Sequence, residues 1–197
     1  MFAEFRIALR PAFTLLLFLT VVTGLAYPLL MFGMAQVLMP GPTNGSLIRD
    51  NGKVIGSTLI GQSFAGQGYF HGRLSAAGKT GYDASASSGS NLAPGAAALQ
   101  DRIAGDVAAM RKEGVNGPIP LDLVTTSASG LDPDISLDAA LVQIPRVAAA
   151  RNISPAVLRD LVMQRKEGSL LGIIGEPRVN VLLLNRQLDQ LARKRSM

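Results

Sequence analysis

The sequence predicts an α+β (mixed α/β) soluble domain preceded by one N-terminal transmembrane helix. An uncharged, mostly apolar stretch separates Arg10 from Arg49, and it exceeds the roughly 20 residues that a helix needs to cross a bilayer. Downstream, short strand-like runs alternate with helix-like runs that are bounded by Ser, Pro and Gly. The 197 residues leave room for one domain with its own core once the membrane segment is set aside.

The apolar stretch is interpreted as a membrane anchor. Pro11 suits the first turn of a helix, where its missing N–H costs nothing, and Pro28 would kink the last turns. A cleaved signal peptide is the alternative, because Gly24 and Ala26 offer the small residues of a cleavage site. The apolar run continues through residues 29–32 and beyond, which a signal peptide does not need, so the anchor is favoured.

Charges on either side of the anchor predict its orientation. The N-terminal tail carries Arg6, Arg10 and the α-amino group against Glu4, whereas the next basic residues lie well beyond the span. Positively charged flanks tend to stay in the cytoplasm. We therefore expect a cytoplasmic tail at residues 1–10, a transmembrane helix at 11–34, a linker at 35–45 and an extracytoplasmic, periplasmic domain at 46–197.

The anchor itself carries no ionisable side chain, so this single helix cannot form an ion path. Thr20 and Gly24 are small residues four positions apart, and Thr23 and Tyr27 add polar groups. Residues of this kind let a neighbouring helix approach closely and form hydrogen bonds. Thr20, Thr23, Gly24 and Tyr27 are therefore the candidate helix-packing face, with a plain lipid anchor as the alternative.

Local signals predict the elements of the domain in order. Asn51 and Gly52 accept the positive φ of a tight turn, so a β-hairpin is expected over residues 46–60. A helix is expected over residues 94–113, closed by Gly114. The remaining expected elements are a strand at 121–126, a helix from Ser136 towards Asn152 interrupted by Pro145, a helix from Ser154 and Pro155 to Gly168, a strand that begins at Gly175, and a last helix from Asn185.

The residue inventory argues against several classes of site. The chain has no cysteine and one histidine, His71, which excludes thiolate chemistry and metal sites that need two imidazoles. No Gly-x-Ser-x-Gly motif accompanies His71, so a hydrolase triad is not expected. Asp132, Asp134, Ser136 and Asp138 alternate like calcium ligands, but turn and cap roles are favoured because the loop lacks the glycine and terminal glutamate of a calcium site. The net charge is +5, yet the basic residues are scattered, so no nucleic acid partner is expected.

Two short polar loops, at residues 88–91 and 127–130, could cradle a phosphate through backbone N–H groups. Neither contains the lysine of a P-loop, so ordinary turns are the alternative. Gln143 and Arg146 lie about one helical turn apart and could face a partner together, with a solvated helix face as the alternative. These residues predict a membrane-tethered extracytoplasmic domain without evident catalytic machinery, of a kind that works in a complex.

Many short motifs follow one another in a fixed order from the membrane helix almost to the C-terminus. They are YP at 27–28, Gln36, GSLI at 45–48, GSTLIGQSF at 56–64, YF at 69–70, Arg73, SAA at 75–77, SGSNL at 88–92, VTTSASGLDPDIS at 124–136, QIPRV at 143–147, ARN at 150–152 and GEPRVNVLLLN at 175–185. Together they resemble the C subunit of the bacterial Kdp potassium-transporting ATPase. Two positions depart from that family's pattern, because Leu74 stands where proline is more usual and Asp134 where histidine is usual.

The resemblance implies an accessory, non-catalytic subunit of a high-affinity, ATP-driven potassium uptake pump in a bacterial inner membrane. It implies three partners, which are a channel-like A subunit, a P-type ATPase B subunit and a small F subunit, with membrane lipid around the helix. It also implies a role in assembly and as a catalytic chaperone that raises the ATP affinity of the B subunit. No cofactor would be tightly bound, and ATP would be contacted only in a transient ternary complex, at Ser88, Gly89, Ser90, Asn91 and Gln143.

The predicted orientation conflicts with that nucleotide role, because ATP is cytoplasmic and these loops are expected outside. The alternative hypothesis is a periplasmic structural cap, which stabilises the complex or shapes potassium entry at the A subunit. An autonomous hydrolase is the least favoured class.

Overall fold

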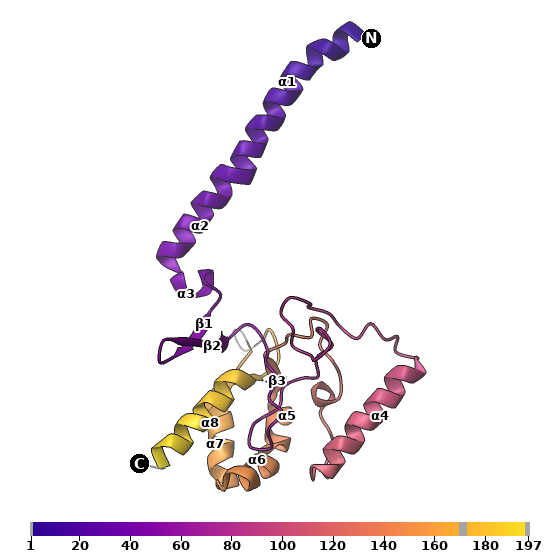
Figure 1. Ribbon diagram of the computed structural model, residues 1–197, viewed down its shortest axis with the longest axis vertical. Coiled ribbons are helices and arrows are strands. Elements are labelled where there is room, and N and C mark those ends of the chain that lie inside the picture. The colour runs from indigo at the N-terminus through magenta and orange to yellow at the C-terminus, as the bar shows by residue number, and fades with distance from the viewer. Residues whose placement is uncertain (1, 170–172, 196–197) are drawn as a thin grey trace. The chain divides into compact units, whose positions relative to one another are not determined.

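The computed structural model describes residues 2–169 and 173–195 of the chain. Residues 1, 170–172, 196 and 197, which belong to the expected tail and domain, lie outside the described residues. The chain forms two compact units, Met1–Leu47 and Ile48–Met197. One long apolar helix followed by a region of helices and small sheets confirms the predicted α+β class (Figure 1).

The first unit is dominated by one helical rod. Helix α1 (Phe2–Val21), a π-helical turn η1 (Val22–Ala26) and helix α2 (Tyr27–Leu38) follow one another without a break. Over Glu4–Leu38 the rod is long and apolar enough to cross a membrane. The expected linker is largely helical, because its first residues continue α2 and Pro40–Thr43 form the short helix α3.

The π-helical turn has a local cause in Pro28. Proline has no N–H, so position 28 cannot donate to the carbonyl of Gly24, which an α-helix would require. The chain responds with a wider turn, in which the Tyr27 N–H donates to the carbonyl of Val22. The Thr23 hydroxyl also donates to the carbonyl of Leu19, at 2.7 Å. The predicted disturbance near Pro28 is therefore present as a π-helical turn.

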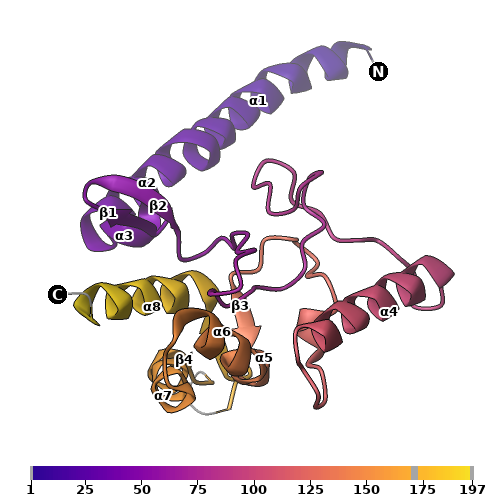
Figure 2. The same ribbon diagram turned by 60° about the horizontal axis from the view of Figure 1, so that its bottom comes forward.

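The second unit begins with the expected β-hairpin. Strands β1 (Leu47–Asp50) and β2 (Lys53–Ser57) pair with each other. Asn51 and Gly52 have φ values of 48° and 81°, as a tight turn requires. Helix α4 (Ala97–Lys112) also confirms its prediction, and Gly114 follows it at φ 90°. No residue of α4 is buried, and most of the helix lies away from helices α5–α8 in both views, although Met110 near its end packs against the core (Figures 1 and 2).

A three-stranded antiparallel sheet, of order β3-β5-β4, and four helices hold the core of this unit. The strands are β3 (Asp134–Ser136), β4 (Lys166–Glu167) and β5 (Arg178–Asn180), and the helices are α5 (Leu137–Val142), α6 (Ile144–Arg151), α7 (Pro155–Arg165) and α8 (Val181–Arg195). Val179 of β5 pairs with Ile135 on one side and Lys166 on the other. Leu158, Leu184 and Leu188 are fully buried around this centre.

Four predicted elements were wrong in type or bounds, and one of them is the strand expected from Gly175, which begins at Arg178. Residues 121–126 contain a 3-10 turn, η2 (Leu121–Leu123), in place of a strand. Helix α7 ends at Arg165, because Lys166 and the residue after it pair with β5. Helix α8 begins four residues before the expected Asn185, because the Asn180 side chain accepts a hydrogen bond from the Leu183 N–H and caps it.

The helix that Ser136 was expected to start is present, and it breaks where predicted. The Ser136 hydroxyl accepts from the Ala139 N–H at 3.1 Å, and α5 and α6 meet at Gln143, two residues before Pro145. Asn152 ends α6 in the left-handed conformation. The junction at Gln143 is the position around which the candidate site is built.

Candidate functional site

Gln143 connects the α5–α6 junction to the long loop that precedes α4. Its side chain is 2% exposed. The amide oxygen of Gln143 accepts from the backbone N–H of His71 at 2.7 Å. The amide nitrogen donates to the backbone carbonyl of His71 at 3.1 Å and to that of Ala139 at 3.0 Å. A second bond to the oxygen comes from Arg146 at 2.7 Å. All four hydrogen-bonding positions of this amide are thus used within the chain.

The neighbouring residue of the loop is held in the same way by Asn185. The Asn185 oxygen accepts from the Phe70 N–H and its nitrogen donates to the Phe70 carbonyl, both at 2.9 Å. Asn185 is 1% exposed and Phe70 is fully buried. The side-chain amides of Asn185 and Gln143 therefore supply the hydrogen bonds that the backbone groups of Phe70 and His71 would otherwise receive from a neighbouring β-strand. We name this arrangement the amide clamp: Gln143, Asn185, Phe70 and His71.

Arg146 extends the clamp towards α4. Its side chain is 7% exposed, its Nε lies 3.3 Å from a carboxylate oxygen of Glu113, and it donates to the Gln67 carbonyl at 2.7 Å. Burial lowers the pKa of Arg146, while Glu113 opposes that shift. Burial also lowers the pKa of His71, and the charge of Arg146 adds to the effect. Gln143 and Arg146 lie together, as their spacing indicated, but both bond within the chain, so they form neither the partner-facing pair nor the solvated helix face that the sequence suggested.

The two predicted small polar loops lie against each other. The Ser88 N–H donates to the Ser129 carbonyl at 3.0 Å, and the Ser87 hydroxyl donates to the same carbonyl at 2.9 Å. A Cβ added at Gly130, which has φ 66°, would lie 2.6 Å from the Ser88 carbonyl oxygen. A Cβ at Gly89 would lie 3.0 Å from the Ala128 carbonyl oxygen. Glycine is required at 130 by both its φ and this close approach.

The expected nucleotide set is therefore divided between two places. Ser88 uses its N–H towards Ser129, and its hydroxyl donates to the Gly89 carbonyl at 3.0 Å. Ser90 is half-buried, and Asn91 is exposed with φ 51°. Among the described residues, no hydrogen bond joins the loop at 88–91 to Gln143. In this part of the chain the two loops pack against each other as turns.

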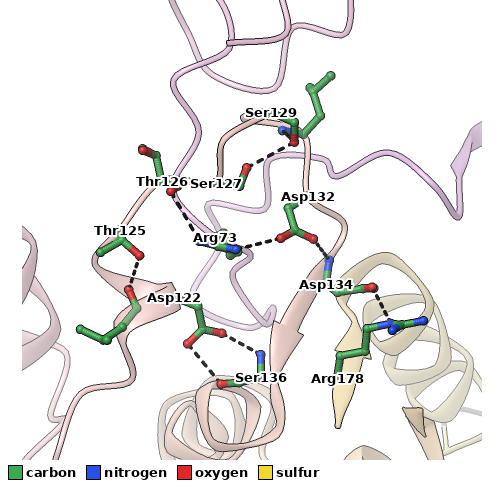
Figure 3. A network of polar contacts seen from close by, with 12 residues as sticks. Arg73, Asp122, Thr125, Thr126, Ser127, Ser129, Asp132, Asp134, Ser136 and Arg178 are labelled. Carbon is green, nitrogen blue, oxygen red and sulfur yellow. Dashed lines mark hydrogen bonds and ion pairs between the residues drawn. The ribbon is translucent and has the colours of Figure 1, made fainter. Parts of the chain in front are cut away.

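A polar network surrounds the 124–136 motif, and Figure 3 shows its members. Arg73 donates to Asp132 at 3.0 Å and so joins the long loop to the segment before β3. Asp122 accepts from the Ser136 N–H at 2.7 Å and from its hydroxyl at 3.1 Å. Asp134 pairs with Arg178 at 3.0 Å. This network borders an open depression of about 460 Å³.

The network favours structural roles for the aspartates that alternate like calcium ligands. Asp132 accepts from the Asp134 N–H and from Arg73, which is the turn role that the sequence favoured. Burial raises the pKa of Asp134, and Arg178 counteracts the shift. Within residues 2–169 and 173–195, no three His, Cys, Asp or Glu side chains are grouped so that they could hold a metal ion.

The two departures from the family pattern both lie in this region. Leu74 forms an isolated parallel bridge with Thr126, so it joins the long loop to the 124–136 motif. Asp134 is in β3, where its carboxylate also accepts from the Asn180 side chain at 3.1 Å. Both positions are thus points of contact between segments far apart in the sequence.

Sequence reasoning missed Asn185, Glu113 and Asp122 as organising residues. Asn185 offered a signal, because it is a polar residue directly after the apolar run Val181–Leu184, and the structure buries it. Glu113 and Asp122 offered none, since their partners are 33 and 14 positions away. The helix-packing residues Thr20, Thr23, Gly24 and Tyr27 all lie exposed around the π-helical turn.

Comparison with known proteins places the chain among potassium pump subunits. The sequence model of the family described as "KdpC: K+-transporting ATPase, c chain" matches residues 9–190. A "Potassium-transporting ATPase KdpC subunit" of Methylorubrum extorquens is 54% identical, and one of Methylobacterium nodulans is 55% identical. Each alignment covers 94% of this chain and 98% of the relative. The chain therefore belongs to the KdpC family, the C subunits of potassium-transporting ATPases.

Proposed function

We propose that this chain is a non-catalytic accessory subunit that holds an ATP-driven potassium uptake pump together from the periplasmic side of a bacterial inner membrane. The observation that carries the proposal is the state of Gln143, the side chain expected to touch ATP. Gln143 is 2% exposed, and its side-chain amide is hydrogen-bonded to His71, Ala139 and Arg146. A residue in this position supports a structural role for the domain.

The charge distribution supports the same proposal. Arg6 and Arg10 precede the apolar rod, and residues 11–48 carry no charge. This bias favours a cytoplasmic N-terminus and a periplasmic domain. ATP is then on the opposite side of the membrane from Ser88 and Gln143. In this position the domain can stabilise the complex or shape potassium entry at the channel-like A subunit.

The helical rod is the proposed attachment to the membrane subunits. The π-helical turn and Pro28 leave backbone carbonyls near Gly24 without the N–H donor that an α-helix would supply from position 28. Such carbonyls are costly in lipid and favour a packed neighbour. Gly24→Leu should therefore weaken copurification with the other pump subunits, whereas Gly33→Leu, at a site with open space, should not. Equal behaviour of the two variants would count against this face.

The competing hypothesis is the one that the resemblance implies, a catalytic chaperone that raises the ATP affinity of the B subunit. It requires that the loop at 88–91 and Gln143 reach a cytoplasmic nucleotide. Gln143 could do so only by giving up its bonds to His71 and Arg146. The two hypotheses differ in location and in ATP dependence, so two measurements separate them.

The first measurement is the location of the domain. The chain has no cysteine, so single cysteines can be labelled without background. Ala98→Cys places the cysteine at an exposed position of α4. Ala8→Cys places it at an exposed position of the N-terminal tail, which is expected on the other side of the membrane. In intact spheroplasts, an impermeant maleimide should label the first and spare the second until the membrane is opened. The reverse pattern would refute the periplasmic location.

The second measurement is the ATP dependence of the assembled pump. Ser90→Ala and Asn91→Ala remove side chains that the chaperone hypothesis assigns to nucleotide, at positions that are not buried. The proposal expects that both leave the KM for ATP unchanged in the complex. A rise in that KM without a loss of assembled complex would favour the chaperone hypothesis instead.

A further inference from the structure

An apolar groove lies between the segment that leads into η2 and helix α5. Its volume is about 640 Å³. Ile119, Leu141 and Val142 line it, and all three are half-buried against the core. At its edge, Leu121 is 76% exposed. Leu121 lines the same groove as Ile119, Leu141 and Val142, so the four form one apolar surface, and contiguous apolar surfaces mark interaction sites.

The groove is preformed in the isolated chain. Pro118 and Pro120 restrict the backbone of the segment, and η2 turns Leu123 into the core, at 4% exposure. Asp122 anchors the same turn by accepting two hydrogen bonds from Ser136. Leu121 is thus held outward by rigid neighbours, which lowers the entropic cost of binding.

The charge at the groove is opposite to that of the chain. Lys and Arg outnumber Asp and Glu by 19 to 14 in the sequence. The groove is lined instead by Asp122 and by the exposed Asp138, and no Lys or Arg is among its lining residues. A patch of this kind complements a partner with an apolar side chain and a nearby positive charge. Nucleic acids and anionic lipid headgroups are disfavoured by the same charge.

We infer that this groove binds an extended segment of another subunit of the pump, in which an apolar side chain fills the floor and a Lys or Arg faces Asp138. The inference rests on the proposed function, because it takes the partner from the same complex. It goes further by assigning the contact surface and the chemistry of the segment that occupies it. Leu121 is the apolar anchor on this chain, and Asp138 is its charged companion.

A photo-crosslinker tests the position of the contact. Leu121→benzoylphenylalanine is introduced in the full chain, expressed with the other pump subunits in native membranes, and irradiated there. The expected adduct is a peptide of another pump subunit that carries an apolar residue with Lys or Arg close by. Leu59→benzoylphenylalanine is the matched control, because Leu59 is 62% exposed and is not among the residues that line the groove. It should not form the same adduct.

Substitutions test the chemistry. Leu121→Asp and Asp138→Lys should each weaken retention in the complex about tenfold, the size expected for an interface anchor. Leu121 is exposed, so the Leu121→Asp variant should melt close to the parent chain, whereas Asp138 lies in the first turn of α5 and Asp138→Lys should lower the stability by up to about 1 kcal/mol. The effect of Asp138→Lys should shrink at high salt, whereas that of Leu121→Asp should persist. Unchanged retention of both variants would overturn the inference.

The outcomes separate this inference from the proposed function. If the parent chain fails to copurify with the P-type ATPase subunit, the proposed function itself fails. If it copurifies, but the crosslinker at position 121 reacts only with lipid or with a second copy of this chain, the groove assignment is overturned and the accessory role stands.

Discussion

Replacing Gln143 with leucine should destabilise the second unit. Gln143→Leu keeps the volume of the side chain but removes the partner of the His71 N–H and of the His71 carbonyl, which lie 2.7 and 3.1 Å from the amide. A buried group left without its partner costs roughly 1–3 kcal/mol. His71 is only half-buried, so the lower part of the range applies, and its two groups alone give about 2–4 kcal/mol, to which the lost bond to the Ala139 carbonyl adds. Arg146 retains Glu113 and the Gln67 carbonyl, so it adds little.

The assay is thermal unfolding of the detergent-solubilised full chain, followed by the loss of helical circular dichroism. For a domain of this size, about 2–4 kcal/mol corresponds to a fall in Tm of roughly 4–16 °C. Gln100→Leu is the matched control, because Gln100 lies exposed on α4, and its Tm should hardly change. A Gln143→Leu chain that melts like the parent, but raises the KM of the pump for ATP, would refute the structural assignment of this residue.

Three further predictions concern packing, pH and an ion pair. Gly130→Ala should lower the free energy of unfolding by at least roughly 2 kcal/mol, because φ is 66° and the new Cβ would lie 2.6 Å from the Ser88 carbonyl. Gly105→Ala, the control, should stabilise α4 by about 0.5–1 kcal/mol. Urea titrations compare the two variants, and equal effects would contradict the packing of the two loops. Burial holds the pKa of His71 below its ordinary value of 6.5, so the unfolded chain binds the proton more readily and stability should fall as pH drops below about 6.5. His71→Asn should flatten that part of a Tm-against-pH curve, and an unchanged slope would exclude His71 as its source. Glu167→Ala should cost under about 1 kcal/mol in urea unfolding, because the side chains of Glu167 and its partner Arg178 are 49% and 52% exposed, and a much larger loss would show that the pair is more than a surface contact.

Elements defined by neighbouring residues were predicted well. The turn at Asn51 and Gly52, the cap at Ser136 and the stop at Gly114 depend on contacts within a few positions. The strand expected at 121–126 was wrong, although its residues have strand propensity. Asp122 binds Ser136, 14 positions away, and so holds a turn where local preference favoured an extended chain.

In the candidate site, too, local features could be predicted from the sequence and contacts between distant residues could not. The loops at 88–91 and 127–130 were both singled out from the sequence, but their mutual packing was not predicted, because the Ser88–Ser129 bond spans 41 positions. Gln143 was singled out as a contact for a ligand. Its principal partner, His71, lies 72 positions away, and only the folded chain shows that the amide is already occupied.

The sequence by itself determined that the chain has one helix long and apolar enough to span a membrane, that an α+β region follows it, and that the family is one of potassium pump subunits. Hydrophobicity, turn residues and ordered motifs are properties of short segments, so they can be read without the fold. The tertiary structure decided what Gln143, Asn185 and Arg146 do, and it exposed Leu121 beside an apolar groove. The physical reason is that a buried polar side chain must find a hydrogen-bond partner, and that partner is often far away in the sequence, so only the folded chain shows which one it is.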